Sequence, residues 1–228
     1  MGLLARVIGV FVSPRATYAA VAARPRWFGV LAITVLLVAG GFFIFLSTEV
    51  GQQAVIDQQL QFMESLGLKL NDTQVEQMES RAQYARYTTA AGQLVGIPIV
   101  QVIIAGILLG IFNVMLGGDA TFKQVLAVVT HSGVIFALQT IFSLPLDYFR
   151  ETMSSPTSLA VFAPFLEETS FMARLLGSID LFQIWSTVSL AIGLGVLYKR
   201  RTAPIATSLF LIYFVIVAAI AAIRSALS

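Results

Sequence analysis

His131 is the residue of this sequence best suited to proton transfer, since it is the one histidine of the chain. It falls within a long apolar stretch, where an ionisable side chain is by default a functional-site hypothesis. On a helix, Gln124 would share its face and Gln139 would lie about 80° away. The candidate intramembrane polar site also takes two residues of the preceding apolar stretch: Gln101, Asn113, Gln124, His131 and Gln139. Such a site is a path for protons or small solutes, or a neutral histidine hydrogen-bonded inside a helical bundle.

Catalysis is not indicated by any combination of these residues. Ser132 follows His131 directly, and neighbours on a helix do not face each other, so the two cannot form a Ser–His dyad. Glu167-Glu168 with Arg174 is similar to the signature of CAAX-type membrane proteases, but the further histidine that this chemistry needs is missing. The chain has no cysteine, which excludes a thiol nucleophile, disulfides and thiolate metal sites. We therefore expect no catalytic residue, no metal and no cofactor.

A second pattern consists of small residues spaced alternately by four and three positions. Gly92 with Gly96, and Gly106 with Gly110, form GxxxG pairs. Small residues let two transmembrane helices approach closely, where lipid supplies no hydrophobic force between them. We predict that this face contacts another helix of the same chain, with a homodimer contact as the alternative. The candidate helix-packing seam comprises Gly92, Gly96, Gly106, Gly110 and Gly117.

Asp180 and Trp185 mark the start of a later apolar stretch. The Asp180 carboxylate would stabilise the positive N-terminal end of a helix dipole, and the Trp185 indole would lie about one turn deeper, near the lipid headgroups. Residues 164–176 carry apolar side chains along one side, which is typical of a helix lying in the membrane interface. Capping and anchoring explain the two residues, and a ligand or headgroup site between them is the alternative.

The apolar residues come in blocks as long as a membrane-spanning helix. Of the 228 residues 57% are apolar and 11% charged, against about 25% charged in a typical soluble domain. About 20 apolar residues suffice to span a bilayer. The sequence therefore predicts an all-α integral membrane protein, a bundle of five transmembrane helices. The five blocks are 27–47, 92–116, 122–146, 179–198 and 203–224.

Segment 48–91, between the first two blocks, is the most polar part of the chain, and we predict a helical hairpin outside the membrane there. Asn71 and Asp72 would end its first helix. Thr73 with Glu76 matches a capping box that opens the second. The segment is a connector that packs on the bundle, or a surface that binds a partner.

Basic residues predict the orientation, because Lys and Arg concentrate on the cytoplasmic side of short loops. With the N-terminus in the cytoplasm, the basic, interfacial segment 1–26, Lys123 and Lys199-Arg200-Arg201 lie inside, together eight of the 14 basic residues. Five spans then place the C-terminus outside, with the loop 147–178 and its interfacial helix. A net charge of +2 is too weak to predict binding to nucleic acid.

A set of short motifs runs along the whole chain. The run Asp180-Leu181-Phe182-Gln183-Ile184-Trp185 is followed by Gly193, Gly195 and a basic stop. Earlier positions add to it: Ser13-Pro14, Pro25, Trp27, Gly118, Phe122, Gln124 and Val125. In this combination the chain resembles the bacterial members of the Yip1 domain family, in which an acidic residue and Phe-x-x-Trp open the fourth helix.

The resemblance implies a five-helix fold more than a function. Eukaryotic members bind Rab-type GTPases and one another, and carry a long polar cytosolic N-terminus that does not precede the first span here. We therefore expect a multi-pass protein of a prokaryotic inner membrane without a GTPase-binding role. The expected function is a non-enzymatic scaffold or adaptor acting on lipids, other membrane proteins or a second copy. The alternatives are a small transporter or channel with a polar path near Asn113, His131 and Gln139, and an accessory subunit of a larger membrane complex.

Overall fold

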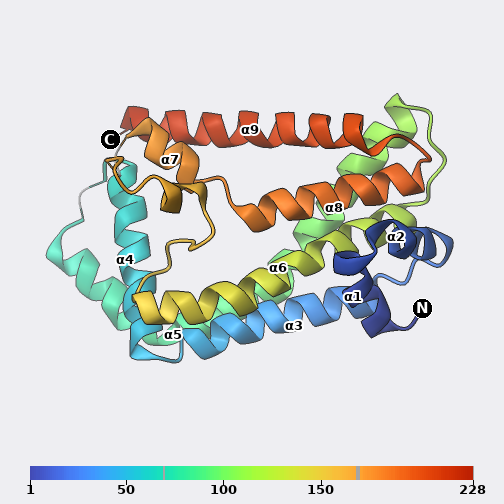
Figure 1. Cartoon of the computed structure of the whole chain (residues 1–228). Coiled ribbons are helices and arrows are strands. Elements are labelled where there is room, and N and C mark those ends of the chain that lie inside the picture. The colour runs from blue at the N-terminus through green and yellow to red at the C-terminus, as the bar shows by residue number, and fades with distance from the viewer. Residues whose placement is uncertain (69, 168–169, 228) are drawn as a thin grey trace. The chain divides into compact units, whose positions relative to one another are not determined.

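A computed structural model of the chain describes residues 1–68, 70–167 and 170–227, so Lys69 and Glu168 lie outside the described residues. The described residues fold into helices, shown in chain order in Figure 1. The elements are α1 (Leu3–Val12), α2 (Pro14–Ala23), α3 (Phe28–Phe45), α4 (Glu49–Ser65), α5 (Asp72–Leu109), the π-helix η1 (Gly110–Met115), α6 (Phe122–Arg150), the 3-10 helix η2 (Leu159–Phe162), α7 (Phe171–Gly177), α8 (Leu181–Leu197) and α9 (Thr202–Leu227).

Four helices of the described chain are long and apolar enough to cross a membrane: α3, α5 with η1, α6 and α9. The helix α8 is also apolar, but its 17 residues make it shorter than these four. The all-helical prediction is confirmed, whereas the structure supplies four helices of spanning length where the sequence predicted five.

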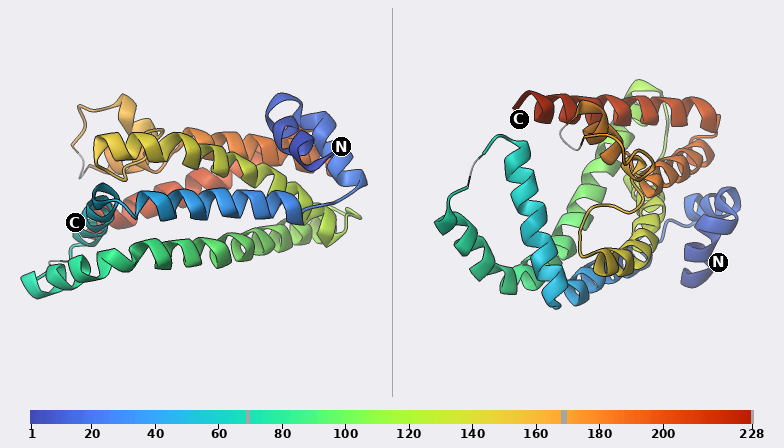
Figure 2. Two further views of the ribbon diagram at one scale, coloured as in Figure 1. Left: turned by 90° about the horizontal axis from the view of Figure 1, so that it is seen from below. Right: turned by 60° about the vertical axis from the view of Figure 1, so that its left-hand side comes forward.

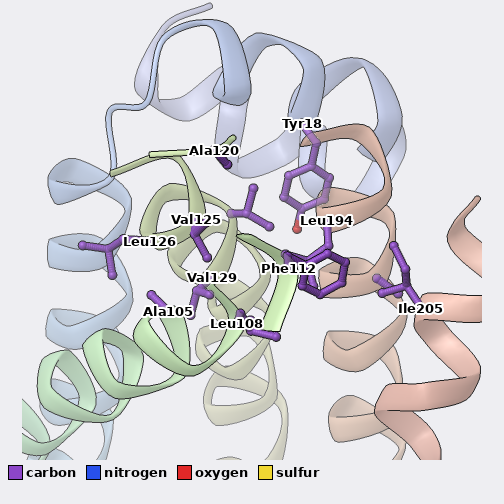
Figure 3. Packing of buried hydrophobic residues seen from close by; sticks show 12 residues of the cluster. Tyr18, Ala105, Leu108, Phe112, Ala120, Val125, Leu126, Val129, Leu194 and Ile205 are labelled. Carbon is purple, nitrogen blue, oxygen red and sulfur yellow. The ribbon is translucent and has the colours of Figure 1, made fainter. Parts of the chain in front are cut away.

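The chain divides into two compact units, and the first consists of residues 1–38, 92–138 and 184–212. Its core forms around α6, and Figure 3 shows Tyr18 pointing from α2 towards Phe112 and Leu194. Within the chain, 72% of the most apolar window of α6 is buried, against 17% for α5 and for α9. The helix α6 is therefore the central element of the core, while α5 and α9 present most of their apolar surface outward.

Gly193 on α8 is what lets Tyr18 reach this core. A Cβ atom at position 193 would lie 2.5 Å from Cγ1 of Val128 and 2.9 Å from Cε1 of Tyr18. The Tyr18 hydroxyl is 2.7 Å from Oγ of Ser189, so the phenol is hydrogen-bonded although it is fully buried. Burial raises the pKa of Tyr18 above its usual range. Tyr18 thus ties the short helix α2 to α8.

The helices α1 and α2 lie side by side as a short hairpin (Figure 2). Pro14 opens α2 as its first residue, which suits a proline because the first helical N–H needs no partner. Ser13 precedes it as the N-cap residue, but its side chain makes no capping hydrogen bond. Arg6 is buried on α1, and its Nη1 donates to the carbonyl oxygen of Arg24 at 3.1 Å.

The second unit comprises residues 39–91, 139–183 and 213–228, as far as these are described. A small apolar core forms where α3 turns into α4, around Phe45, Leu46, Ala54 and Leu144. Thr48 begins α4 as its N-cap, with its hydroxyl oxygen accepting from the Gly51 amide at 3.0 Å.

The start of α5 differs from the prediction in its capping residues. The Gln74 amide donates to Oδ1 of Asn71 at 2.9 Å, and the Asn71 amide donates to Oε1 of Gln74 at 3.0 Å. This reciprocal pair is a capping box one turn long, so the predicted box of Thr73 and Glu76 is wrong. Asn71 is the capping residue because it directly precedes the first helical residue, as an N-cap must, whereas Thr73 is already inside the helix.

The helix α5 also continues without a break from Asp72 to Leu109, so the polar residues 72–91 do not form a separate helix. Gly92, which the sequence analysis placed at the start of a new span, is tolerated inside it. Pro98 lies within the same helix and removes one backbone donor from it.

The predicted interfacial helix 164–176 is shorter than expected, because α7 begins only at Phe171. Ser170 caps it, and its Oγ accepts from the Ala173 amide at 3.2 Å. Residues 164–167 are turns and irregular structure instead. A capping serine at position 170 therefore fixes the start of the helix, and Pro164 does not. The helices α7 and η2 lie side by side (Figure 1).

Candidate functional site

His131 is fully buried in α6 within the first unit. Its Nδ1 is 2.6 Å from the carbonyl oxygen of Ala127, one turn earlier. Since a carbonyl only accepts, Nδ1 carries the proton and Nε2 is left as an acceptor. Nε2 has no hydrogen-bond partner among the described residues, and neither do Oγ1 of Thr34 and Oε1 of Gln101. A buried polar atom left unpaired costs about 1–3 kcal/mol, so this interior carries polar groups that do not stabilise it.

Gln101 approaches α6 at a different place from the histidine ring. A Cβ atom added at Gly133 would lie 2.7 Å from Nε2 of Gln101, so the glycine makes room for the amide. Gly133 is two residues after His131, about 200° around the helix. Gln101 therefore packs against another side of α6 than the one that His131 occupies.

Asn113 and Gln124 hold chain segments together and do not line a path. Nδ2 of Asn113 donates to the carbonyl oxygen of Ala120 at 2.7 Å, and its Oδ1 accepts from the Tyr198 hydroxyl at 2.9 Å. Oε1 of Gln124 accepts from the Thr121 amide at 2.8 Å. Its Nε2 donates to the carbonyl oxygen of Ala22 at 3.0 Å, where α2 ends.

The five residues of the predicted polar site are thus not brought together. Asn113 and Gln124 bond to the turn between η1 and α6, while His131 lies about two and a half turns into α6. Gln139 is half-buried and belongs to the second unit. The transporter interpretation therefore gains no continuous row of polar side chains from this geometry.

The candidate helix-packing seam lies on the side of α5 opposite to its buried residues. A Cβ atom added at Gly92, Gly96, Gly106 or Gly110 would meet nothing within 4 Å among the described residues outside its own helix turn. The buried residues of this part of α5 lie on the opposite side: Gln101, Ala105 and Leu108. The described residues therefore do not supply the predicted contact with another helix of the same chain. The side of α5 that packs inward carries residues larger than glycine instead.

Gly117 leaves the seam because the helix changes its pitch. Residues Gly110–Met115 form a π-helix, which takes more residues per turn than the α-helix assumed in the spacing argument. Gly117 then ends the element with a φ of 69°, a left-handed conformation that glycine adopts freely. The seam as observed comprises Gly92, Gly96, Gly106 and Gly110.

Asp180 caps α8 and has its oxygens occupied by donors of the chain itself. Oδ1 accepts from the Phe182 amide at 2.8 Å, and Oδ2 accepts from the hydroxyls of Ser155 at 2.5 Å and Thr157 at 2.6 Å. Trp185 is 39% exposed and packs edge-on against Phe11, with ring centroids 5.5 Å apart. Asp180 belongs to the second unit and Trp185 to the first, so the two residues are placed by different surroundings.

Arg6 is a buried charged residue that the sequence analysis did not single out. It is 3% exposed, and burial, with repulsion from Arg26 and Arg24, lowers its pKa. The signal was its position one turn before the buried Val10, on the inner face of α1. Arginine is rarely buried, so this spacing alone did not overrule the usual expectation.

Comparison with known proteins identifies the class of the chain. The Yip1 domain matches residues 8–223. The membrane protein YknW of Bacillus subtilis (strain 168) is 27% identical over 194 residues, which cover 82% of this chain and 76% of the relative. No solved structure matches. The match over almost the entire length, with the long apolar helices, shows that this multi-pass bacterial membrane protein belongs to the Yip1 domain family.

Proposed function

We propose that the chain is a non-enzymatic membrane scaffold that associates with another transmembrane helix through the glycine face of α5. The observation that carries this proposal is the openness of that face, defined by Gly92, Gly96, Gly106 and Gly110. GxxxG faces promote close contact between helices in lipid. No other described residue outside the same helix turn comes within 4 Å of a Cβ atom added at these glycines.

We further propose five spans, with the N-terminus in the cytoplasm. The helix α8 has 17 residues, which corresponds to about 26 Å at 1.5 Å per residue and to the lower limit of a spanning helix. Lys199, Arg200 and Arg201 follow it directly and would remain on the inner side, in agreement with the basic N-terminal segment.

A second copy of the chain is the simplest occupant of the glycine face. Most homo-oligomers use two-fold interfaces, in which the same patch of both copies meets. A face of repeated glycines along one helix is self-complementary in this sense. Another membrane protein with a small-residue face is the alternative occupant, and it would make the chain an adaptor.

Cysteine cross-linking in membranes tests this proposal, because the wild-type chain has no cysteine. Ile99 lies on the glycine face and is 52% exposed, while its neighbour Val100 is 53% exposed but lies about 100° around the helix. We expect Ile99→Cys to form a disulfide-linked dimer on mild oxidation. The matched variant Val100→Cys should remain monomeric under the same conditions.

A bulky residue on the same face provides the second arm. Gly106→Leu should abolish the Ile99→Cys cross-link, while the thermal unfolding midpoint of the purified protein should hardly change, because the added side chain meets open space. Equal cross-linking of both cysteine variants, or a cross-link that survives Gly106→Leu, would refute the proposed dimer. An adduct of other mass in place of the dimer would instead identify a heterologous partner.

A further inference from the structure

An apolar groove runs between the end of α5 and the start of α9, within the first unit. Its volume is about 350 Å³, comparable with small-molecule sites in proteins. Most of the lining residues are apolar, among them Leu108, Phe112, Leu116, Ile205, Leu209 and Ile212. Arg200 and Arg201 also line it, and both are exposed. The groove thus combines an oily wall with two guanidinium groups.

The chain fixes the backbone that leads into these two arginines and the side chain of Arg200. Lys199 adopts a left-handed conformation with a φ of 52°, and the Arg200 amide donates to the carbonyl oxygen of Gly195 at 2.9 Å. This arrangement ends α8 as a Schellman motif and turns the chain into α9. Nη2 of Arg200 then donates to the carbonyl oxygen of Leu116 at 2.7 Å, at the end of η1. The Arg200 side chain is held across the two elements that form the groove.

The same contact leaves binding capacity free for an anion. A guanidinium has five N–H donors, and the bond to Leu116 uses one of them. Phosphate, like carboxylate, presents oxygens that a guanidinium can bind with two parallel N–H···O bonds. No acidic residue is among those that line the groove in the described chain.

The surroundings define what kind of molecule brings the phosphate. The chain is a membrane protein, and the groove lies where two apolar helices meet the run of basic residues that ends α8. Basic pockets between transmembrane helices near the cytoplasmic surface are sites for anionic lipid headgroups. A lipid would place an acyl chain along the apolar walls and its phosphate between the arginines, using both properties of the groove at once.

We propose that this groove is a specific binding site for an anionic phospholipid, with the phosphate held by Arg200 and Arg201. The groove and the glycine face lie on different sides of α5, so lipid binding does not depend on the proposed dimer. Loss of either property would therefore leave the other unaffected.

Native mass spectrometry of the detergent-purified chain, titrated with phosphatidylglycerol or with phosphatidylcholine of the same acyl chains, tests the site. A basic residue near a lipid surface contributes about 1 kcal/mol, which corresponds to about fivefold in affinity. We therefore expect Arg201→Gln to weaken phosphatidylglycerol binding about fivefold and the pair Arg200→Gln and Arg201→Gln roughly 25-fold. Binding of phosphatidylcholine should not change.

A matched double variant separates this site from general attraction of lipid to positive charge. Arg15→Gln with Arg26→Gln removes the same charge from exposed positions of the basic N-terminal segment. This pair should retain wild-type binding of phosphatidylglycerol. A loss equal to that of the Arg200 and Arg201 pair would overturn the proposal, since it would mean that only net charge matters.

The apolar part of the groove is tested without any change in charge. Ser208 lines the groove, whereas its exposed neighbour Thr207 does not. Ser208→Phe should fill the groove and lower phosphatidylglycerol binding at least fivefold, and Thr207→Phe should leave it unchanged. The thermal unfolding midpoint of each variant shows that it is folded, and equal binding by folded Ser208→Phe and Thr207→Phe would exclude the groove as the acyl-chain site.

Discussion

Gly193 and Gly40 differ in what their missing side chain does, although both have only apolar neighbours in sequence. At Gly193 the space of a methyl group is taken by Val128 and Tyr18, whereas at Gly40 no described atom lies within 4 Å of an added Cβ outside the helix itself. The first glycine is required for packing. The second occupies an ordinary helical position, where alanine is the better helix former.

We therefore predict that Gly193→Ala destabilises the protein by about 1–3 kcal/mol, the usual range for overpacking a tight core. Gly40→Ala should be neutral or stabilising by up to about 1 kcal/mol, the difference in helix propensity. Thermal unfolding of both variants in the same detergent measures this. If Gly193→Ala unfolded at the wild-type temperature, the close approach of Tyr18 to α8 would be wrong.

At the scale of elements, the first turn of α5 depends on one asparagine. Asn71→Ala should remove the capping bond to the Gln74 amide and cost about 0.5–2 kcal/mol of local helix stability. Thr73→Ala is the matched control, because the structure gives Thr73 no capping role. Hydrogen exchange of the Gln74 amide reports the difference, and faster exchange in Thr73→Ala alone would restore the capping box inferred from the sequence.

A second feature at the scale of elements is the junction between η1 and the end of α8, which Asn113 holds together. Tyr198 stacks on Phe112 with ring centroids 4.6 Å apart and donates its hydroxyl to Asn113. Tyr198→Phe keeps the stacking and loses one hydrogen bond, so it should cost about 1 kcal/mol. Asn113→Ala removes both of its bonds and should cost more, about 2–3 kcal/mol. Thermal unfolding ranks the two, and the reverse order would contradict this account.

At the scale of the whole molecule, the number of spans determines where the C-terminus lies. Five spans place Ser225 outside, on the same side as Ser80 and on the opposite side from Ser13. Four spans, with α8 not crossing the membrane, place Ser225 inside. All three serines are exposed, and single cysteines at these positions have no background in a cysteine-free chain. We predict that an impermeant maleimide labels Ser80→Cys and Ser225→Cys in intact cells, and Ser13→Cys only after permeabilisation. Protection of Ser225→Cys until permeabilisation would favour four spans.

Much of the fold was predictable because a helix that crosses a bilayer needs an apolar block of about 20 residues. The blocks 27–47, 122–146 and 203–224 each fall on a long apolar helix. Family membership was predictable as well, from motifs such as the run at Asp180. Asn71 was missed as a cap because Thr73 with Glu76 also satisfies the pattern, and only the position of the first helical residue decides between them.

The candidate sites were less predictable, because spacing gives the face of a helix but not what that face meets. Gln124 and His131 are seven residues apart and so share a helix face. The side chain of Gln124 nevertheless bonds to the turn before α6, where its Oε1 accepts from the Thr121 amide. The groove with Arg200 was missed for a related reason. A basic run after an apolar block is read as a stop for the helix, and its contact with Leu116, 84 positions earlier, depends on tertiary structure.

Substitutions at the exposed glycine face of α5 can also separate what the protein needs for folding from what it needs for function in the membrane. In the described part of the chain, a Cβ atom added at Gly92, Gly96, Gly106 or Gly110 meets nothing within 4 Å outside its own helix turn. A library of all substitutions there, selected in growing cells and sorted in parallel for expression, would have two independent readings. Variants that are expressed normally but impair growth would identify the positions at which a binding partner packs against this helix.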